Sequence, residues 1–364
     1  MTRLLSVDAL RGLTVAAMVL VNNPGTWRAV YPPLRHAPWH GWTPTDVIFP
    51  FFVFIVGVAI PLALEPRIGS AGRGAVVFRV VRRSLVIFAL GIILNGFPEY
   101  AWATLRIPGV LQRIAVCYLV AALIYLSTST RAQAFIASGL LVGYWLAMTM
   151  VPVPGYGAGD LSPAGNLAAY IDRAILGPHI WQVAKVYDPE GILSTVPAAA
   201  TALLGVLTGT WLRSGRGAGV IATRLAVAGI VGVAVGELWS WWFPINKSLW
   251  TSSYVVLTTG LAVLALAACY WLVEVRGWRH WAIPFAVLGV NALVLFFLST
   301  LVARLLYVLR VGAEARSLQA VIFDRVFAPL ASPVNASLGF AVAYVIAWWA
   351  ILCLLYRWNI RLRV

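Results

Sequence analysis

The chain has 364 residues, of which 61% are hydrophobic and only 11% are charged, and its mean hydropathy is +0.87. Soluble domains carry about 25% charged residues, so this composition excludes an ordinary water-soluble fold and indicates a protein solvated by lipid. The net charge of +15 would suggest a nucleic-acid partner in a soluble protein, but here the arginines lie in short links between apolar runs, and no nucleic-acid partner is expected.

Ten apolar windows of bilayer-spanning length follow one another along the chain. A transmembrane helix needs about 20 such residues, and the runs are continuous rather than alternating, which favours helices over barrel strands. We therefore expect an all-α polytopic membrane bundle with about ten transmembrane helices, forming a single transmembrane domain over residues 1–364. The predicted spans are residues 5–23, 46–64, 76–96, 107–127, 134–152, 192–212, 220–243, 253–273, 282–303 and 335–356.

The first window resembles a signal peptide, but Asp8 and Arg11 interrupt it and no small-residue cleavage pattern follows, so we interpret it as the first membrane helix. Asp8 and Arg11 are spaced to pair with each other. The inner segments then hold more cations than the outer ones, mostly in short links, and the terminal Arg3, Arg361 and Arg363 belong to this inner set. Both termini are therefore predicted to be cytoplasmic.

Polar residues of several predicted helices meet in one layer near the outer face. Charged groups are costly within a membrane, so each is a functional candidate. The layer contains Asn22, His36, His40, Asp46, Gln112, Arg113, Glu237, Asn246 and Lys247. Simpler interpretations stay open: His36 as an interfacial anchor, Arg113 and Glu237 as a structural ion pair, and Trp39 and Trp250 as part of an aromatic belt rather than as stacking surfaces for a sugar.

The inner face carries arginines at the start of the third predicted helix. Arg82 and Arg83 fit the positive-inside rule, but guanidinium groups are also suited to a polyphosphate. The three cysteines, Cys117, Cys269 and Cys353, lie in apolar stretches without paired or metal-type spacing. The sequence therefore predicts neither a disulfide framework nor a metal site.

Several motifs together resemble the heparan-α-glucosaminide N-acetyltransferase family. They occur in the family's order along nearly the whole chain, ending with a weaker match at residues 284–291. The motifs are residues 3–12 (RLLSVDALRG), Val21-Asn22, residues 36–46 (HAPWHGWTPTD), 49–54 (FPFFVF), 106–113 (RIPGVLQR), 187–193 (YDPEGIL) and 244–251 (PINKSLWT).

The resemblance implies a membrane enzyme that takes acetyl from cytosolic acetyl-coenzyme A and places it on the amine of a terminal glucosamine, such as a heparan sulfate-type chain end, on the far side. The family's catalytic histidine matches His36 and its partner asparagine matches Asn22, while Asp46 is positioned to orient the imidazole or attract the amino sugar. The expected location is the cell inner membrane, with His36 facing the periplasm.

Further assignments complete the predicted site. Arg82, Arg83, Gln112 and Arg113 are expected to bind the acetyl-coenzyme A, and Trp39, Glu237, Asn246, Lys247 and Trp250 to bind the amino-sugar acceptor. The histidine could act as a general base or carry the acetyl group itself. An amino-sugar permease without acyltransferase activity is the alternative function, because transporters also have polar groups within about ten helices. A homodimer is the commonest symmetric assembly and the first expectation for the oligomer.

Overall fold

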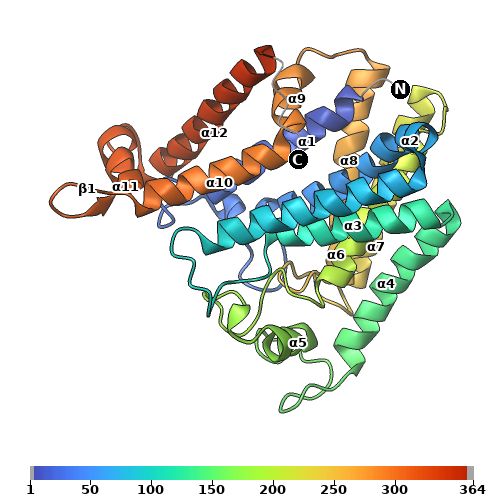
Figure 1. Ribbon diagram of the computed structural model, residues 1–364, viewed down its shortest axis with the longest axis horizontal. Helices are drawn as coiled ribbons and strands as arrows, with labels where there is room; N and C mark the ends of the chain where they lie inside the picture. Colours follow the sequence, from blue (N-terminus) through green and yellow to red (C-terminus); the bar gives the residue numbers. More distant parts are fainter. Residues whose placement is uncertain (1–3, 359–364) are drawn as a thin grey trace.

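The computed structural model describes residues 4–358, apart from the side chain of Ala71, so the orientation predictions that rest on Arg3, Arg361 and Arg363 lie outside the described residues. Its helices run in the order shown in Figure 1. They are α1 (Leu5–Asn22), α2 (Ile48–Gly96), α3 (Val110–Ser127), α4 (Thr130–Met150), α5 (Leu167–Leu176), α6 (Thr195–Leu212), α7 (Ala218–Trp239), α8 (Ser252–Tyr270), α9 (Ala282–Val290), α10 (Ala292–Val308), α11 (Leu318–Ile322) and α12 (Pro333–Arg357).

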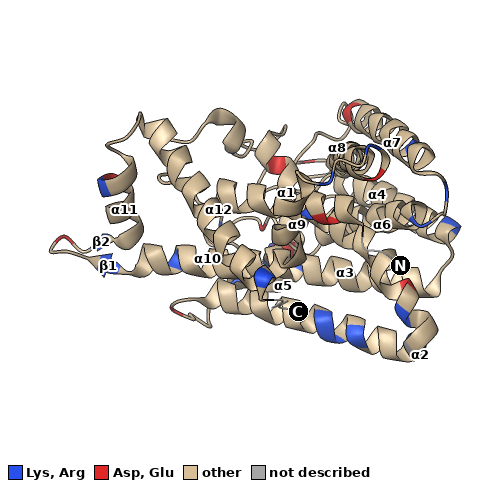
Figure 2. Ribbon diagram, turned by 90° about the horizontal axis from the view of Figure 1, so that it is seen from above, with Lys and Arg blue, Asp and Glu red and all other residues tan. Residues whose placement is uncertain are grey.

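The all-α polytopic architecture is confirmed. Eight of the described helices are long and apolar enough to cross a membrane, and α9 with α10 makes a ninth span if that pair, bent by 75°, is counted as one. The remaining predicted window, residues 76–96, is the second half of α2; it carries Arg79, Arg82 and Arg83 and is not among those spans. Each of the ten windows is thus helical. Figure 2 shows basic residues, in blue, on α2 itself.

The long helix α2 reverses direction at Gly72. This residue has φ of 76°, a left-handed conformation that favours glycine, and residues on both sides of it line one cavity. Ile60 and Ile87 could not do so on a straight helix, because 27 residues would separate them by about 40 Å. The two halves of α2 are therefore neighbouring antiparallel helices.

Glycines allow the helices to approach closely. A methyl group at Gly57 of α2 would lie 2.0 Å from the carbonyl oxygen of Ala202 on α6, and one at Gly12 of α1 would lie 1.8 Å from that of Phe285 on α9. Small residues are typical of helix interfaces in membranes, where packing replaces the hydrophobic effect. These contacts place α2 beside α6 and α1 beside α9.

Two segments lie outside the main bundle. Helix α5 and the irregular chain around it cover one end of α3 and α6, and a hairpin of β1 (Arg310–Val311) and β2 (Arg316–Ser317) precedes α11 at the far edge (Figure 1). Short helical turns fill the other links: 3-10 helices η1 (Pro32–Leu34), η2 (Pro44–Val47) and η3 (Gly177–His179), and π-helices η4 (Trp271–Val275) and η5 (Phe323–Phe327).

Candidate active site

The loop between α1 and α2 brings His36 against Asp46. The imidazole Nδ1 lies 2.6 Å from Asp46 Oδ1. Asp46 belongs to η2, and its side chain is only 1% exposed. Its other oxygen, Oδ2, accepts hydrogen bonds of 3.0 Å from the backbone N–H groups of Ala37 and Thr43. These donors fix the carboxylate so that Oδ1 faces the imidazole.

The Asp46 contact decides which nitrogen of His36 can accept a proton. A carboxylate only accepts hydrogen bonds, so Nδ1 carries the hydrogen and Nε2 is left with its lone pair. The His36 side chain is 51% exposed, and a substrate can reach it. A half-exposed imidazole held by a buried carboxylate can act as a general base.

Lys247 completes this cluster from the link between α7 and α8. Its Nζ lies 3.0 Å from His36 Nδ1, 3.3 Å from His36 Nε2 and 3.4 Å from Asp46 Oδ1. Burial lowers the pKa of Lys247, while the charges of Asp46 and Glu190 oppose that shift. Two predicted site residues that are 201 positions apart, Asp46 and Lys247, are thus brought together.

Asn246 is fully buried and shapes the link that carries Lys247. Its Oδ1 accepts a hydrogen bond of 2.9 Å from the Leu249 N–H, and its Nδ2 lies 3.4 Å from His40 Nδ1. Partial burial lowers the pKa of His40, which suits a neutral ring that accepts from an amide. Asn246 therefore positions its neighbours.

The two predicted tryptophans lie in different surroundings. Trp39 is half-buried, donates from Nε1 to the Leu161 carbonyl at 2.9 Å and meets the Tyr187 ring edge-on at 4.9 Å between centroids. Trp250 is only 1% exposed and lies against the rings of Phe49 and Tyr254. Trp250 is thus a core residue rather than part of an aromatic belt.

Two other predicted residues stand apart from His36. Asn22 is the exposed last residue of α1, and Glu237 is exposed near the end of α7. Within residues 4–358, neither side chain makes a hydrogen bond with His36, Asp46 or Lys247. By contrast, Asp8 and Arg11 pair as predicted, at 3.1 Å.

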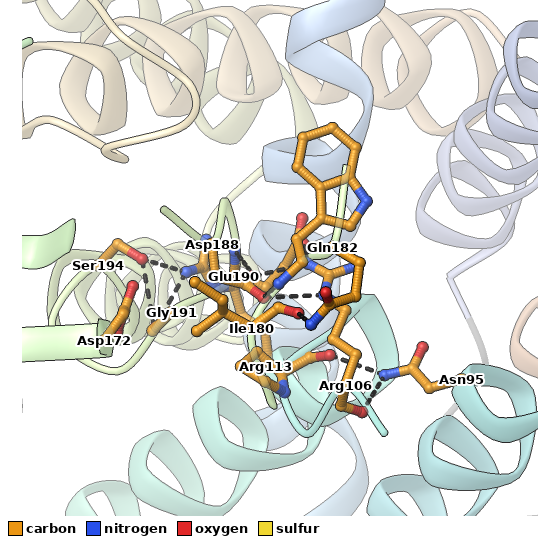
Figure 3. A network of polar contacts seen from close by, with 12 residues as sticks. Asn95, Arg106, Arg113, Asp172, Ile180, Gln182, Asp188, Glu190, Gly191 and Ser194 are labelled. Atoms are coloured by element: carbon orange, nitrogen blue, oxygen red, sulfur yellow. Dashed lines mark hydrogen bonds and ion pairs between the residues drawn. The ribbon is translucent and has the colours of Figure 1, made fainter. Parts of the chain in front are cut away.

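A second polar region joins Arg106 to two acidic residues (Figure 3). Arg106 Nε donates to Asp188 Oδ2 at 2.8 Å, Nη2 donates to Asp188 Oδ1, and Nη2 also donates to Glu190. Burial would lower the pKa of Arg106, but the hydrogen bonds and charges of Asp188 and Glu190 outweigh it and raise the pKa. Asp188 also accepts from the backbone N–H groups of Trp181 and Glu190, both at 2.9 Å. These bonds hold the long loop after α5 against the start of α3.

Arg113 is buried beside this network. The helix predicted over residues 107–127 begins instead at Val110, because the preceding Gly109 is extended, so Arg113 lies in the first turn of α3. Its Nη2 donates to Ser194 and to the Gly191 carbonyl, and its guanidinium lies 4.8 Å from the Trp250 ring centroid. Among the described residues Arg113 makes no ion pair with Glu237, so that interpretation was wrong.

Asp172 of α5 faces the same loop. It is 1% exposed, and its Oδ1 accepts a hydrogen bond of 2.8 Å from the Ile192 N–H. Burial raises the pKa of Asp172 to about 6, with a further contribution from Asp188, whereas the Ile192 N–H and Arg113 act in the opposite direction. Sequence reasoning assigned no role to Asp172, Asp188 or Glu190, although the last two lie within a motif that carried the family resemblance.

A cavity of about 380 Å³ lies between α1, both halves of α2, α3 and the break between α9 and α10. Three cations line it, Arg11, Arg67 and Arg83, so the predicted Arg83 takes part. The predicted Arg82 is exposed and is not a lining residue; neighbouring positions on a helix point in different directions. The cavity therefore has a basic lining drawn from three separate segments.

The cavity extends toward the His36 region. Its lining includes Phe52, which is six residues or about 9 Å along the chain from Asp46, and Ile114, which follows Arg113. Asn291 lines the cavity, and its buried Oδ1 has no hydrogen-bond partner among the described residues; the same holds for Gln112 Nε2 and for Arg113 Nε and Nη1, which are buried two and one positions before the lining residue Ile114. Since buried polar groups are usually paired, these atoms fit a polar ligand.

Comparison with known proteins identifies relatives over most of the chain. Residues 3–185 match the family described as "Domain of unknown function (DUF5009)". The human heparan-alpha-glucosaminide N-acetyltransferase is 32% identical over 354 aligned residues, covering 81% of this chain and 52% of its own length, and the mouse protein of that name is 31% identical over 351, covering 81% and 53%. The chain spans about half the length of the curated relatives it matches. The resemblance inferred from the motifs is confirmed.

Proposed function

This chain belongs to the DUF5009 family and shares most of its length with N-acetyltransferases, and we propose that it is a transmembrane N-acetyltransferase acting as a single domain. The acyl donor is acetyl-coenzyme A, and the acceptor is the amine of a glucosamine-type sugar on the opposite side of the membrane. The observation that carries the proposal is a half-exposed imidazole, oriented by a buried carboxylate, near one end of a basic cavity.

The cavity lining fits the donor. Arg11, Arg67 and Arg83 offer guanidinium groups for its phosphates, and apolar residues such as Phe52 and Ile114 suit the narrow pantetheine arm. The unpartnered Asn291 Oδ1 can accept a hydrogen bond from an amide of that arm. In this assignment Gln112 and Arg113 contact the acetyl end of the coenzyme, where its thioester reaches the His36 region.

The chemistry requires removal of a proton from the attacking amine. His36 Nε2 takes that proton as the amine nitrogen bonds to the thioester carbonyl carbon, and Asp46 stabilises the resulting imidazolium through Nδ1–H. The carbon–sulfur bond then breaks, and the thiolate takes up the proton. In the covalent variant His36 Nε2 first attacks the thioester carbon and expels the coenzyme A thiolate; the amine then attacks the acetyl carbon, the bond to Nε2 breaks, and the amine proton passes to the thiolate. Asn22 is the proposed donor to the carbonyl oxygen, where negative charge develops.

The remaining assignments concern the acceptor. Lys247 contacts both His36 and Asp46, and Trp39, a half-buried ring three residues after His36, is the proposed aromatic contact for the sugar. The proposed orientation places His36 at the periplasmic face of the cell inner membrane and Arg67 and Arg83 toward the cytoplasm. An amino-sugar permease would need no base oriented in this way.

Purified protein in detergent, supplied with acetyl-coenzyme A and glucosamine, should release free thiol in proportion to N-acetylglucosamine formed. His36→Ala should abolish both products while leaving thermal unfolding and acetyl-coenzyme A binding nearly unchanged. The matched control is His280→Ala, since that residue is exposed in the link between α8 and α9. Amino-sugar counterflow in vesicles without thiol release would instead identify a permease.

A further inference from the structure

An arginine cluster lies at the end of α6 and the start of α7, away from the His36 region. The guanidinium carbons of Arg216 and Arg224 lie 5.0 and 5.2 Å from the ring centroid of Trp211. Arg213 follows Trp211 by two residues, and its Nη1 lies 3.5 Å from Glu65 Oε2. Three cations and one carboxylate leave this cluster positive. A bias toward cytoplasmic arginines does not by itself require two of them to stack on one indole.

The same turn contains buried polar atoms without a partner. They are Thr210 Oγ1, Trp211 Nε1 and Arg213 Nε, three atoms within four consecutive residues, and none has a hydrogen-bond partner in the part of the chain that the structure describes. Buried donors are nearly always paired in proteins. Their concentration beside the arginines indicates a ligand that brings oxygen atoms.

An apolar groove of about 440 Å³ begins next to the cluster. It runs between α4, α6, α7 and α8, and its lining includes Ser138, Leu207, Thr208, Ala228 and Val263. Its area is mainly apolar, and α4 and α7 are largely unburied by the rest of the protein, which places the groove on the lipid-facing side of the bundle. A groove of this kind can hold a hydrocarbon chain.

Helical spacing joins the groove to the cluster. Trp211 follows Thr208 by three residues, and Arg224 precedes Ala228 by four, so each continues the groove face of its helix one turn further. On α4, Arg131 precedes the lining residue Ser138 by seven residues, two turns along the same face. At this end of the groove, α4, α6 and α7 thus each carry a cationic or aromatic side chain.

We propose that this surface binds an anionic phospholipid, with the headgroup phosphate on Arg213, Arg216 and Arg224 and one acyl chain in the groove. Guanidinium groups bind phosphate in a bidentate manner, and the apolar groove extends in the direction that an acyl chain takes from its headgroup. A free phosphate or a nucleotide would use the arginines alone. No residue of the cluster lines the basic cavity, so this inference is independent of the proposed acetyl transfer.

Native mass spectrometry of the detergent-purified protein with palmitoyl-oleoyl phosphatidylglycerol or phosphatidylcholine tests the proposal. The double variant Arg216→Gln/Arg224→Gln should retain phosphatidylglycerol at least about fivefold less than the unsubstituted protein. The matched double variant Arg73→Gln/Arg279→Gln removes two other exposed arginines, one directly after the reversal of α2 and one between η4 and α9, and should stay within about twofold. Equal retention by the two double variants would overturn the proposal.

The groove is tested separately. Ala228→Trp fills it and should reduce retention of phosphatidylglycerol, whereas Ile230→Trp, on the exposed face of the same helix, should not. Millimolar inorganic phosphate and acetyl-coenzyme A should fail to displace the lipid. If the arginine variant instead loses acetyl-coenzyme A affinity in calorimetry and keeps its lipid, the cluster binds a nucleotide. Thermal unfolding verifies that each variant is folded.

Discussion

The two polar regions of this protein use the same residue types in opposite ways. In the His36 region, a buried carboxylate holds an imidazole that is 51% exposed, and the second ring nitrogen, Nε2, meets only the Lys247 ammonium, at 3.3 Å. In the Arg106 region, Asp188 is fully buried, and each of its oxygens accepts both from the guanidinium and from a backbone N–H. The first region can exchange a proton with a substrate. The second, with its bonds saturated, holds a loop in place.

The largest effect is expected from Asp46→Asn. An asparagine amide would donate to His36 Nδ1, which forces the hydrogen onto Nε2 and removes the base. Acetyl transfer should fall by about 10²- to 10⁴-fold. Its carbonyl oxygen can still accept from the Ala37 and Thr43 N–H groups, and Lys247, which loses the carboxylate, can release its proton as an arginine cannot, so the free energy of unfolding should fall by less than in the Arg106 region. Thiol release measures the first quantity and scanning calorimetry the second; near-normal turnover would show that this carboxylate does not orient the imidazole.

Asp188→Asn makes the same chemical change in the other region and should give the reverse result. Arg106 would lose a charge partner but keep Glu190, and the free energy of unfolding should fall by about 3 kcal/mol, the low end for a broken buried ion pair. The fall in turnover per folded molecule should be at least about tenfold smaller than the fall caused by Asp46→Asn. Turnover lost without loss of stability would mean that both regions take part in the chemistry.

Asp172 gives a pH-dependent form of the comparison. In the folded protein Asp172 keeps its proton up to about pH 6, whereas an unperturbed aspartate loses it near 3.8. Between these values the folded state binds more protons than the unfolded state, so the free energy of unfolding should decrease as pH rises and level off above about 6. The decrease should be roughly 2 to 3 kcal/mol. Asp172→Asn should flatten this part of a stability profile measured by denaturant unfolding; an unchanged profile would assign the effect to another group.

Hydropathy predicted the helices but not their path. All ten windows are helical because burial in lipid needs only a local run of apolar residues. The reversal at Gly72 and the bend at Asn291 depend on backbone conformation and on neighbouring helices, which a hydropathy window does not contain. The start of α3 at Val110 rather than at Ile107 has the same cause, since the chain is still extended at Gly109.

The site was predictable where its residues are close in sequence or belong to a recognised motif. His36 and Asp46 are ten residues apart and are in contact. The Lys247 contact with both could not be placed, because 211 residues separate it from His36 and only the tertiary fold decides the approach. One open interpretation paired Arg113 with Glu237, but its guanidinium donates to Ser194 and to the Gly191 carbonyl, which follow α5 in the chain. The motif containing Asp188 and Glu190 marked important residues without indicating that their partner is Arg106.

The smallest effect is expected from Thr43→Ala, which tests whether the orientation of Asp46 and the stability of its loop depend on the same hydroxyl. Thr43 Oγ1 lies 2.6 Å from the Arg35 carbonyl and 3.1 Å from Asp46 Oδ2, so it links the start of η2 to the loop that carries His36. Thr43→Ala should cost about 1 kcal/mol of unfolding free energy, as capping residues do. It should lower turnover only a few-fold, because the backbone N–H groups still hold the carboxylate. Thr43→Ser keeps the hydroxyl and should restore both the free energy of unfolding and the turnover. If it restores the free energy of unfolding but not the turnover, the hydroxyl contributes to the fold of the loop but not to the orientation of Asp46.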